Sequence, residues 1–324
     1  MDFGAAVWGP MVARAGGVKE AEDLCLQFLR LTFGVKSSAV GVVLLREVGW
    51  APVWAIWVRR AARFWNRVVK RGQGDLVRAA LVESCEIAAA GGPPGGPTST
   101  CWAAHMAAAV RKLAERLGTD WRADVVGMAA LPTALVRGTG EAGGQWWRLD
   151  LSVGGQAAIS QGDAAALQVR DVPARMREGF KIYTHHRWFA VPLGGEEKEG
   201  RRFWQVLRSK AAVRRVAQLR MAAHRLAIEE GRFSGVPRAN RVCVVCQQGQ
   251  REDERHFVFE CTRYALIRRR YADLFNGADA MTNASDLEMQ QWMNPPSGRE
   301  ATFWPRLNAF LFECWLSRAL GMAL

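Results

Sequence analysis

Three cysteines and one histidine stand close together near the C-terminal end of the sequence. The pattern is Cys243-x2-Cys246, nine further residues, His256, four residues and Cys261. Two thiolates separated by two residues on a tight turn can share one metal ion, and the histidine and last cysteine can complete a tetrahedron around zinc. Because four protein ligands leave no open coordination position, the pattern predicts one structural Zn2+ and not a catalytic metal.

Two other interpretations of this cluster are weaker. A redox-active Cys-x2-Cys pair is expected inside a thioredoxin-like βαβ unit, and the flanking sequence has no such pattern. A chance cluster would not place a fourth ligand at a suitable spacing. The odd number of cysteines, seven, argues against a secreted disulfide framework and for a reducing, intracellular compartment, with nucleus or cytoplasm left open. Buried free thiols are expected at Cys25, Cys85, Cys101 and Cys314.

The residues beside the cluster allow further expectations. Asp253 and Glu254 precede His256, and a carboxylate there could orient the imidazole. Exposed loop acids are the more common case, and we favour that interpretation. The alternation of large and small apolar residues at 257–259 predicts a short strand that packs under the metal.

The charge of the chain is strongly positive. Its formal net charge is +13, which favours polyanionic partners, with nucleic acid first. The alternative is a solvated, arginine-rich surface without a partner. Eight basic residues and no acid lie in 201–228, before the cluster, and a second basic run follows it. We therefore predict non-specific binding of RNA or DNA through phosphate contacts. The candidate residues are Arg214, Arg215, Arg220, Arg225, Arg241, Arg263, Arg268, Arg269 and Arg270.

The hydrophobic pattern predicts a mainly α protein. Nearly half of the residues, 49%, are hydrophobic, so the chain can bury a core, and no uncharged apolar window of about 18 residues predicts a membrane span. We expect a helical region over 1–120, an irregular middle over 121–200, and basic helices with the zinc-binding segment 243–261 and a C-terminal helix over 201–324. Helices are predicted at 18–33, 38–48, 52–72, 74–90, 98–117, 203–230, 262–275 and 300–322, and a minor β-hairpin at 145–160.

Other chemical motifs are absent or incomplete. The GxGxxG at 138–143 precedes a strand-like segment, whereas a dinucleotide site needs a helix there. The YADL at 271–274 lacks the second aspartate of a polymerase metal site, and no convincing set of paired carboxylates for two-metal chemistry stands elsewhere. His185, His186 and His224 have no partner at metal-ligand spacing, so we assign them no role. An enzyme, either nuclease or polymerase, is therefore the weakest hypothesis.

Two segments resemble the region after the polymerase domain in LINE-type, non-LTR retrotransposon reverse transcriptases. The first runs from the Ala223-His224 pair to Phe275 and includes the zinc cluster. The residues that carry it are His224, Ile228, Glu229, Gly231, Arg232, Arg241, Cys243, Cys246, Asp253, Glu254, His256, Phe257, Cys261, Tyr264 and Arg268. The second is upstream and shares Gly34, Val35, Lys36, Ser38, Glu47, Gly49, Pro52, Phe64 and Trp65.

The resemblance implies a non-catalytic, zinc-binding region that grips template RNA or target DNA. It also implies the reverse transcriptase domain of the parent element as a partner. Polymerase activity is not implied, because the palm aspartates and an endonuclease domain are missing. The competing hypothesis is an inactive remnant of a decayed retroelement that keeps only its structural zinc site.

Overall fold

The fold is mainly α, as predicted. The computed structural model describes Gly9 and residues 18–68, 70–72, 74–89, 101–106, 108–109, 184–189, 202–275, 285–295 and 298–322. Within these ranges there is no extended strand, only an isolated antiparallel bridge between Val242 and Arg251. The hairpin predicted at 145–160 and the GxGxxG motif at 138–143 lie outside the described residues.

The chain forms two compact units, each built from two stretches of sequence. The first comprises residues 1–25 and 50–162, and the second comprises residues 26–49 and 163–324. The predicted boundaries near 120 and 200 fall outside the described residues, so the three-part division stays a prediction. Among the described helices no single one is long and apolar enough to cross a membrane. Helices α3 (Gly41–Val48) and α4 (Val53–Val68) meet that criterion only when the two are counted together as one bent pair.

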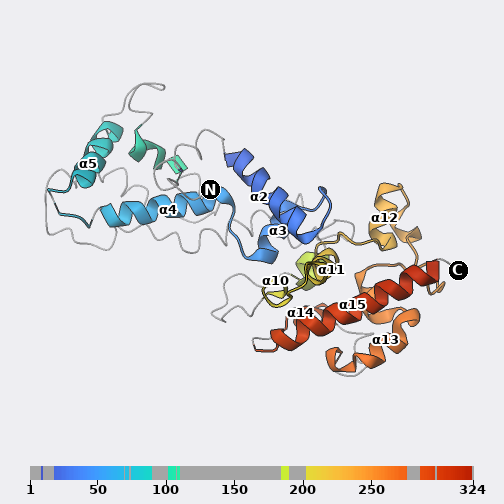
Figure 1. Ribbon diagram of the computed structural model, residues 1–324. Helices are drawn as coiled ribbons and strands as arrows, with labels where there is room; N and C mark the ends of the chain where they lie inside the picture. The colour runs from blue at the N-terminus through green and yellow to red at the C-terminus, as the bar shows by residue number, and fades with distance from the viewer. Residues whose placement is uncertain are drawn as a thin grey trace. The chain divides into compact units, whose positions relative to one another are not determined.

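In the first unit, helix α4 (Val53–Val68) packs against α5 (Leu76–Ala89), as Figure 1 shows. Glycine and proline flank both segments in the sequence, which is why their predicted bounds are close to those observed. Trp65 is buried and stacks on Trp102 with ring centroids 5.9 Å apart. The buried core contains Val58, Ala61, Ala62, Trp65, Val68, Leu81, Cys85, Ala103, Met106 and Ala109.

Helices α2 (Val18–Phe33) and α3 (Gly41–Val48) confirm the predicted spans. Gly34 ends α2 with a left-handed φ of +62°, and a Cβ there would lie 2.7 Å from the Arg214 side chain. The helical period of α2 follows Leu24, Phe28 and Leu31 in the sequence, but these side chains are more than half exposed. Residues on the other side, such as Leu29 and Phe33, make the buried contacts instead.

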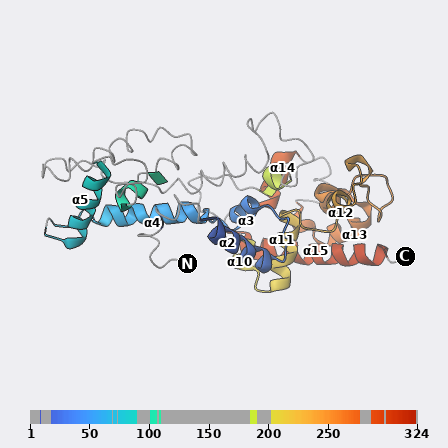
Figure 2. The same ribbon diagram turned by 90° about the horizontal axis from the view of Figure 1, so that it is seen from above.

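The second unit is arranged around the long helix α15 (Glu300–Met322), which confirms the predicted C-terminal helix. Helices α10 (Phe203–Val206), α11 (Lys210–Arg220) and α13 (Ala265–Arg270) all contact it (Figures 1 and 2). The predicted span 203–230 is therefore three helices, the third being α12 (Ala227–Phe233). Helix α14 (Asp286–Met293) was not predicted and contacts the π-helical turn η3 (His185–Phe189).

A buried ionic cluster ties four of these elements together. Glu47 of α3 accepts a hydrogen bond from Arg220 of α11 over 2.8 Å and lies 2.8 Å from His185 Nε2. Arg220 also donates to the carbonyl oxygens of Phe189 and Met293. A buried charge must be paired and hydrogen-bonded to be tolerated, and this guanidinium and carboxylate satisfy each other.

Protonation of this cluster depends on its environment. Burial alone would raise the pKa of Glu47, but the Arg220 guanidinium and the His185 hydrogen bond lower it to about 2. Burial lowers the pKa of His185, so the neutral imidazole donates its Nε2 proton to the carboxylate.

We expect the second unit to lose stability on acidification. Both folded pKa values lie below the ordinary values of 6.5 for His185 and 4.5 for Glu47, so the unfolded chain binds protons first. The loss should begin as the pH falls through about 6.5 and continue below about 4.5, with Glu47 contributing on the order of 3 kcal/mol.

Urea unfolding at pH 7 and pH 5.5 in excess zinc tests this expectation. A His185→Asn variant is the matched control, because it removes one titrating group and keeps a side chain that can donate to Glu47. Its stability should depend less on pH over this interval. An unchanged pH dependence in the variant would contradict the assignment.

Candidate metal centre

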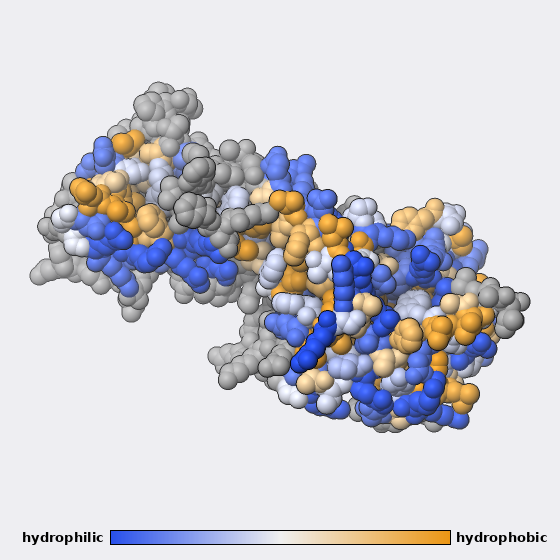
Figure 3. All heavy atoms as spheres, viewed as in Figure 1, coloured by the Kyte–Doolittle hydropathy of each residue, from blue (hydrophilic) through white to orange (hydrophobic). Residues whose placement is uncertain are grey.

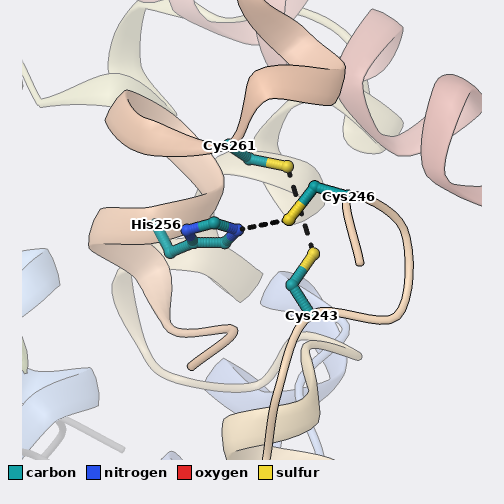
Figure 4. A group of neighbouring side chains, drawn as sticks. All are labelled: Cys243, Cys246, His256 and Cys261. Atoms are coloured by element: carbon teal, nitrogen blue, oxygen red, sulfur yellow. Dashed lines mark hydrogen bonds between the residues drawn. The ribbon is translucent and has the colours of Figure 1, made fainter. Parts of the chain in front are cut away.

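The four predicted ligands converge on one point (Figure 4). All four ligand atoms of Cys243, Cys246, His256 and Cys261 lie within 4.8 Å of one another. The Sγ atoms of Cys243 and Cys261 are 4.0 Å apart, and Cys246 Sγ lies 3.4 Å from His256 Nε2. Tetrahedral Zn–S and Zn–N bonds of about 2.3 and 2.1 Å require separations of roughly 3.5–3.8 Å. The residues therefore fit one zinc ion, with Nε2 as the histidine ligand.

A tight turn positions the first two ligands. The bridge between Val242 and Arg251 closes it, and Cys243 N donates to Gln250 O over 2.7 Å. Backbone N–H groups of Val245 and Cys246 donate to the Cys243 sulfur. Such donors stabilise a thiolate, so the backbone of the turn is arranged for anionic sulfur ligands.

A π-helical turn positions the other two ligands. His256 begins the turn η5 (His256–Glu260), and Cys261 N donates back to His256 O over 2.7 Å. The Asp253 carboxylate accepts a hydrogen bond from the His256 backbone N–H over 3.0 Å. The strand predicted for residues 257–259 is wrong, because this short apolar run is buried on all sides and forms a helical turn instead.

The carboxylate nearest to the free side of the imidazole is Glu260. His256 Nδ1 is buried without a hydrogen bond, and Glu260 Oε2 lies 3.9 Å away. Metal-bound histidines usually donate their second N–H to a carboxylate or carbonyl, so a small shift of Glu260 would complete this contact. We expected Asp253 and Glu254 to be exposed loop acids, and this prediction is wrong. Glu254 is buried, Asp253 is mostly buried, and both carboxylates form hydrogen bonds.

Acids between the two ligand pairs anchor the site to the rest of the unit. Glu252 forms a two-contact pair with Arg318 of α15, with distances of 2.8 and 2.9 Å, and also accepts from Ala227 N. Glu254 accepts a hydrogen bond from Thr184 and lies 3.0 Å from His224 Nε2. These side chains are almost fully buried, so the metal-binding segment is part of the unit's interior.

Aromatic packing joins the π-helical turn to α15 and α14. Phe257 stacks on Trp315 with ring centroids 4.4 Å apart and meets Tyr264 edge-on at 5.1 Å. Phe259 packs edge-on against Trp292 at 4.8 Å. Both phenylalanines are buried, so they serve the core and are not available for stacking on bases.

One thiol of the cluster is stabilised as a thiolate, and the others hold their protons in the absence of a metal. A hydrogen bond from Cys261 lowers the pKa of Cys243 to about 3, and the same bond raises the pKa of Cys261. Burial raises the pKa of Cys246. A bound dication would remove the repulsion between the thiolates and deprotonate the remaining ligands.

Four of the nine predicted nucleic-acid-binding arginines donate hydrogen bonds to backbone carbonyl oxygens, and two of these four are buried. Arg220 and Arg268 are buried, with 4% and 7% of their surface exposed, so they cannot contact a phosphate backbone. All four donate hydrogen bonds to carbonyl oxygens: Arg214 to Leu31, Arg220 to Phe189 and Met293, Arg241 to Ile228 and Val236, and Arg268 to Cys261. These arginines were predicted from charge alone, which does not distinguish a surface cation from a backbone donor.

The other five are more accessible. Arg215 donates to Asn308 and lies over the Phe312 ring at 4.8 Å, and Arg270 pairs with Glu313. The side chains of Arg225, Arg263 and Arg269 are exposed and form no hydrogen bond or ion pair with any described residue. Arg263 and Arg269 closely follow the metal-binding segment in sequence, and Arg225 directly follows His224, which is bonded to Glu254 within that segment.

Sequence reasoning missed the structural roles of two histidines. His185 and His224 were given none, yet each is buried and pairs with a glutamate, Glu47 or Glu254. The partners are 138 and 30 residues apart, so no local spacing could indicate them.

The chain was also compared with known proteins, and it matches no protein-family model, no curated protein and no solved structure. The interpretation of the site therefore depends on its own geometry.

We expect Cys246→Ser to release zinc and unfold the metal-binding segment. Structural zinc contributes on the order of 10 kcal/mol to the folding of such segments. Metal content should fall from one equivalent towards zero by atomic absorption after dialysis. Cys314→Ser, which changes a cysteine outside the cluster, is the control and should retain zinc. A Cys246→Ser protein with a full equivalent would contradict the ligand assignment.

We also expect Arg318→Met to destabilise the unit and weaken zinc binding. Removing one partner leaves the Glu252 carboxylate buried and unpaired, at a cost of roughly 3–5 kcal/mol. The double variant Glu252→Gln/Arg318→Met should be less destabilised than Arg318→Met alone, as measured by urea unfolding and competition with a zinc chelator.

Arg306→Met is the matched control, because it breaks an exposed pair with Asp273. Such a pair contributes about 1 kcal/mol or less. Equal destabilisation by the two arginine substitutions would show that the buried pair has no special role.

Proposed function

We propose that the chain is a zinc-stabilised nucleic-acid-binding region of the kind that follows the polymerase domain in LINE-type, non-LTR retrotransposon reverse transcriptases. The observation that carries the proposal is the set of exposed arginines around the metal-binding segment, Arg225, Arg263 and Arg269. The side chains of all three are without a hydrogen-bond or ion-pair partner among the described residues. Unpaired guanidinium groups on a strongly basic chain are suited to phosphate contacts.

The family resemblance gains support from the role of the residues that carry it. Glu47, His224, Arg241 and Arg268 are held in buried or backbone-directed bonds. Gly231 lies against Arg241, and a Cβ there would come within 2.7 Å of the Arg241 side chain. Residues that resemble a family pattern are expected to be the ones on which a shared fold depends.

We infer that the region is non-catalytic. All four coordination positions would be taken by protein side chains, which leaves none for water or substrate. The proposed partners are RNA or DNA without sequence specificity, and the reverse transcriptase domain of the parent element. The metal would act by holding the exposed arginines on a folded surface.

Fluorescence anisotropy of a labelled single-stranded RNA with the zinc-loaded protein tests this function. The wild type should bind, and its affinity should fall steeply with salt. Arg225→Gln/Arg263→Gln/Arg269→Gln should bind more weakly, and the slope of log K against log salt should decrease by about 2 for three lost phosphate contacts. Cys261→Ser should also lose binding.

Arg63→Gln/Arg67→Gln/Lys70→Gln is the charge-matched control, since it removes three exposed cations from the first unit. It should retain most of the affinity. Equal losses in the two triple variants would indicate attraction by net charge alone. No RNA or DNA binding by the wild type would leave a structural zinc site on a remnant without this function.

A further inference from the structure

Helix α15 presents an apolar stripe to solvent. Phe312, Leu316 and Leu320 are spaced four residues apart and are 50%, 51% and 59% exposed. We call these three residues the α15 stripe. Residues at this spacing lie on one face of a helix over about 12 Å. Figure 3 shows hydrophobic residues reaching the surface along this part of the molecule.

The stripe is not needed to hold the unit together. Arg318, two residues from Leu316, is buried in its pair with Glu252, and Leu311 and Cys314 are buried as well. Residues two apart point about 200° away from each other on a helix, so the metal-binding segment and the stripe use opposite faces of α15. Contiguous exposed apolar side chains with no role in the core mark an interaction surface.

The stripe has one positively charged border. On the side of α11, the Arg215 guanidinium lies over the Phe312 ring, and residues 203–228 contain no acid. On the side of α13, Glu313 is neutralised by Arg270 and accepts a hydrogen bond from the Tyr271 hydroxyl. The described residues beside the stripe therefore offer cations on one side and no unpaired anion on the other.

We propose that the α15 stripe docks an amphipathic helix of a partner protein whose apolar face is bordered by acidic residues. An apolar row at helical spacing is the complement of another helix's apolar face, and its basic border selects acidic flanks. A second copy of the chain would add its own basic border and supply no acidic one, which is unfavourable. Nucleic acid fits less well, because leucine side chains have no π-face on which bases stack.

The test uses three labelled peptides of about three heptads. The first has leucine at the a and d positions and glutamate elsewhere. The second has lysine in place of glutamate, and the third has the first composition in scrambled order. Fluorescence anisotropy should show binding of the first peptide to the full chain and much weaker binding of the other two.

Leu316→Glu should weaken binding of the glutamate peptide at least tenfold, because it places a like charge in the stripe. Leu76→Glu, which substitutes a still more exposed leucine outside α15, should change it less than twofold. Thermal unfolding of both variants should match the wild type, because neither side chain is in the core.

Several results would overturn the proposal. One is no binding of the glutamate peptide, and another is equal binding of the lysine peptide. A third is a wild-type dimer in light scattering that Leu316→Glu converts to a monomer, which would make the occupant a second copy. A fourth is loss of RNA binding in Leu316→Glu, which would assign the stripe to nucleic acid. Because RNA binding is measured separately, failure of this surface and failure of the proposed function are distinguishable.

Discussion

The buried pair between Glu252 and Arg318 connects the metal-binding segment to the helix around which the second unit is built. Its partners are 66 residues apart, and both side chains are almost inaccessible to solvent. Glu252 lies between Cys246 and His256, so its position determines how the two ligand pairs approach each other. The same carboxylate accepts from Ala227 N at the start of α12. One ion pair therefore sets the geometry of the site and the place of two helices.

The arginines of this protein have two different uses. Net charge suggests a surface that attracts polyanions, yet Arg214, Arg220, Arg241 and Arg268 donate to backbone carbonyl oxygens. A guanidinium has five donors in a fixed planar arrangement, so one side chain can satisfy carbonyl groups from segments that have no regular pairing. This explains how the irregular connections between the described helices satisfy their backbone carbonyl groups where the described residues form no sheet. It also means that the charge available to a partner is smaller than the formal value.

Local features were predictable from the sequence, and distant ones were not. The zinc ligands lie within 19 residues and follow known ligand spacing, so their convergence follows from the spacing alone. Helices α2, α3 and α4 are bounded by glycine or proline, and their spans were predicted closely. The partnership of Glu47 with Arg220 spans 173 residues, and no periodicity indicates it. Residues 257–259, within the turn at 256–260, were predicted as a strand because a short apolar run fits either period.

The metal-binding segment and the proposed docking stripe use opposite faces of α15. They are separate surfaces, but the stability of both depends on the same helix. The metal-binding segment rests on α15 through Arg318 and Trp315, whereas the stripe at Phe312 and Leu316 points away from it. A helix docked on the proposed stripe would therefore leave the metal-binding face of α15 undisturbed. Both faces nevertheless require α15 to be held in place. Loss of the metal would remove the support that Glu252 and Phe257 give to this helix, and the stripe would lose its rigid position along with the basic surface. A structural ion would in this way support both of the proposed binding surfaces without touching either ligand.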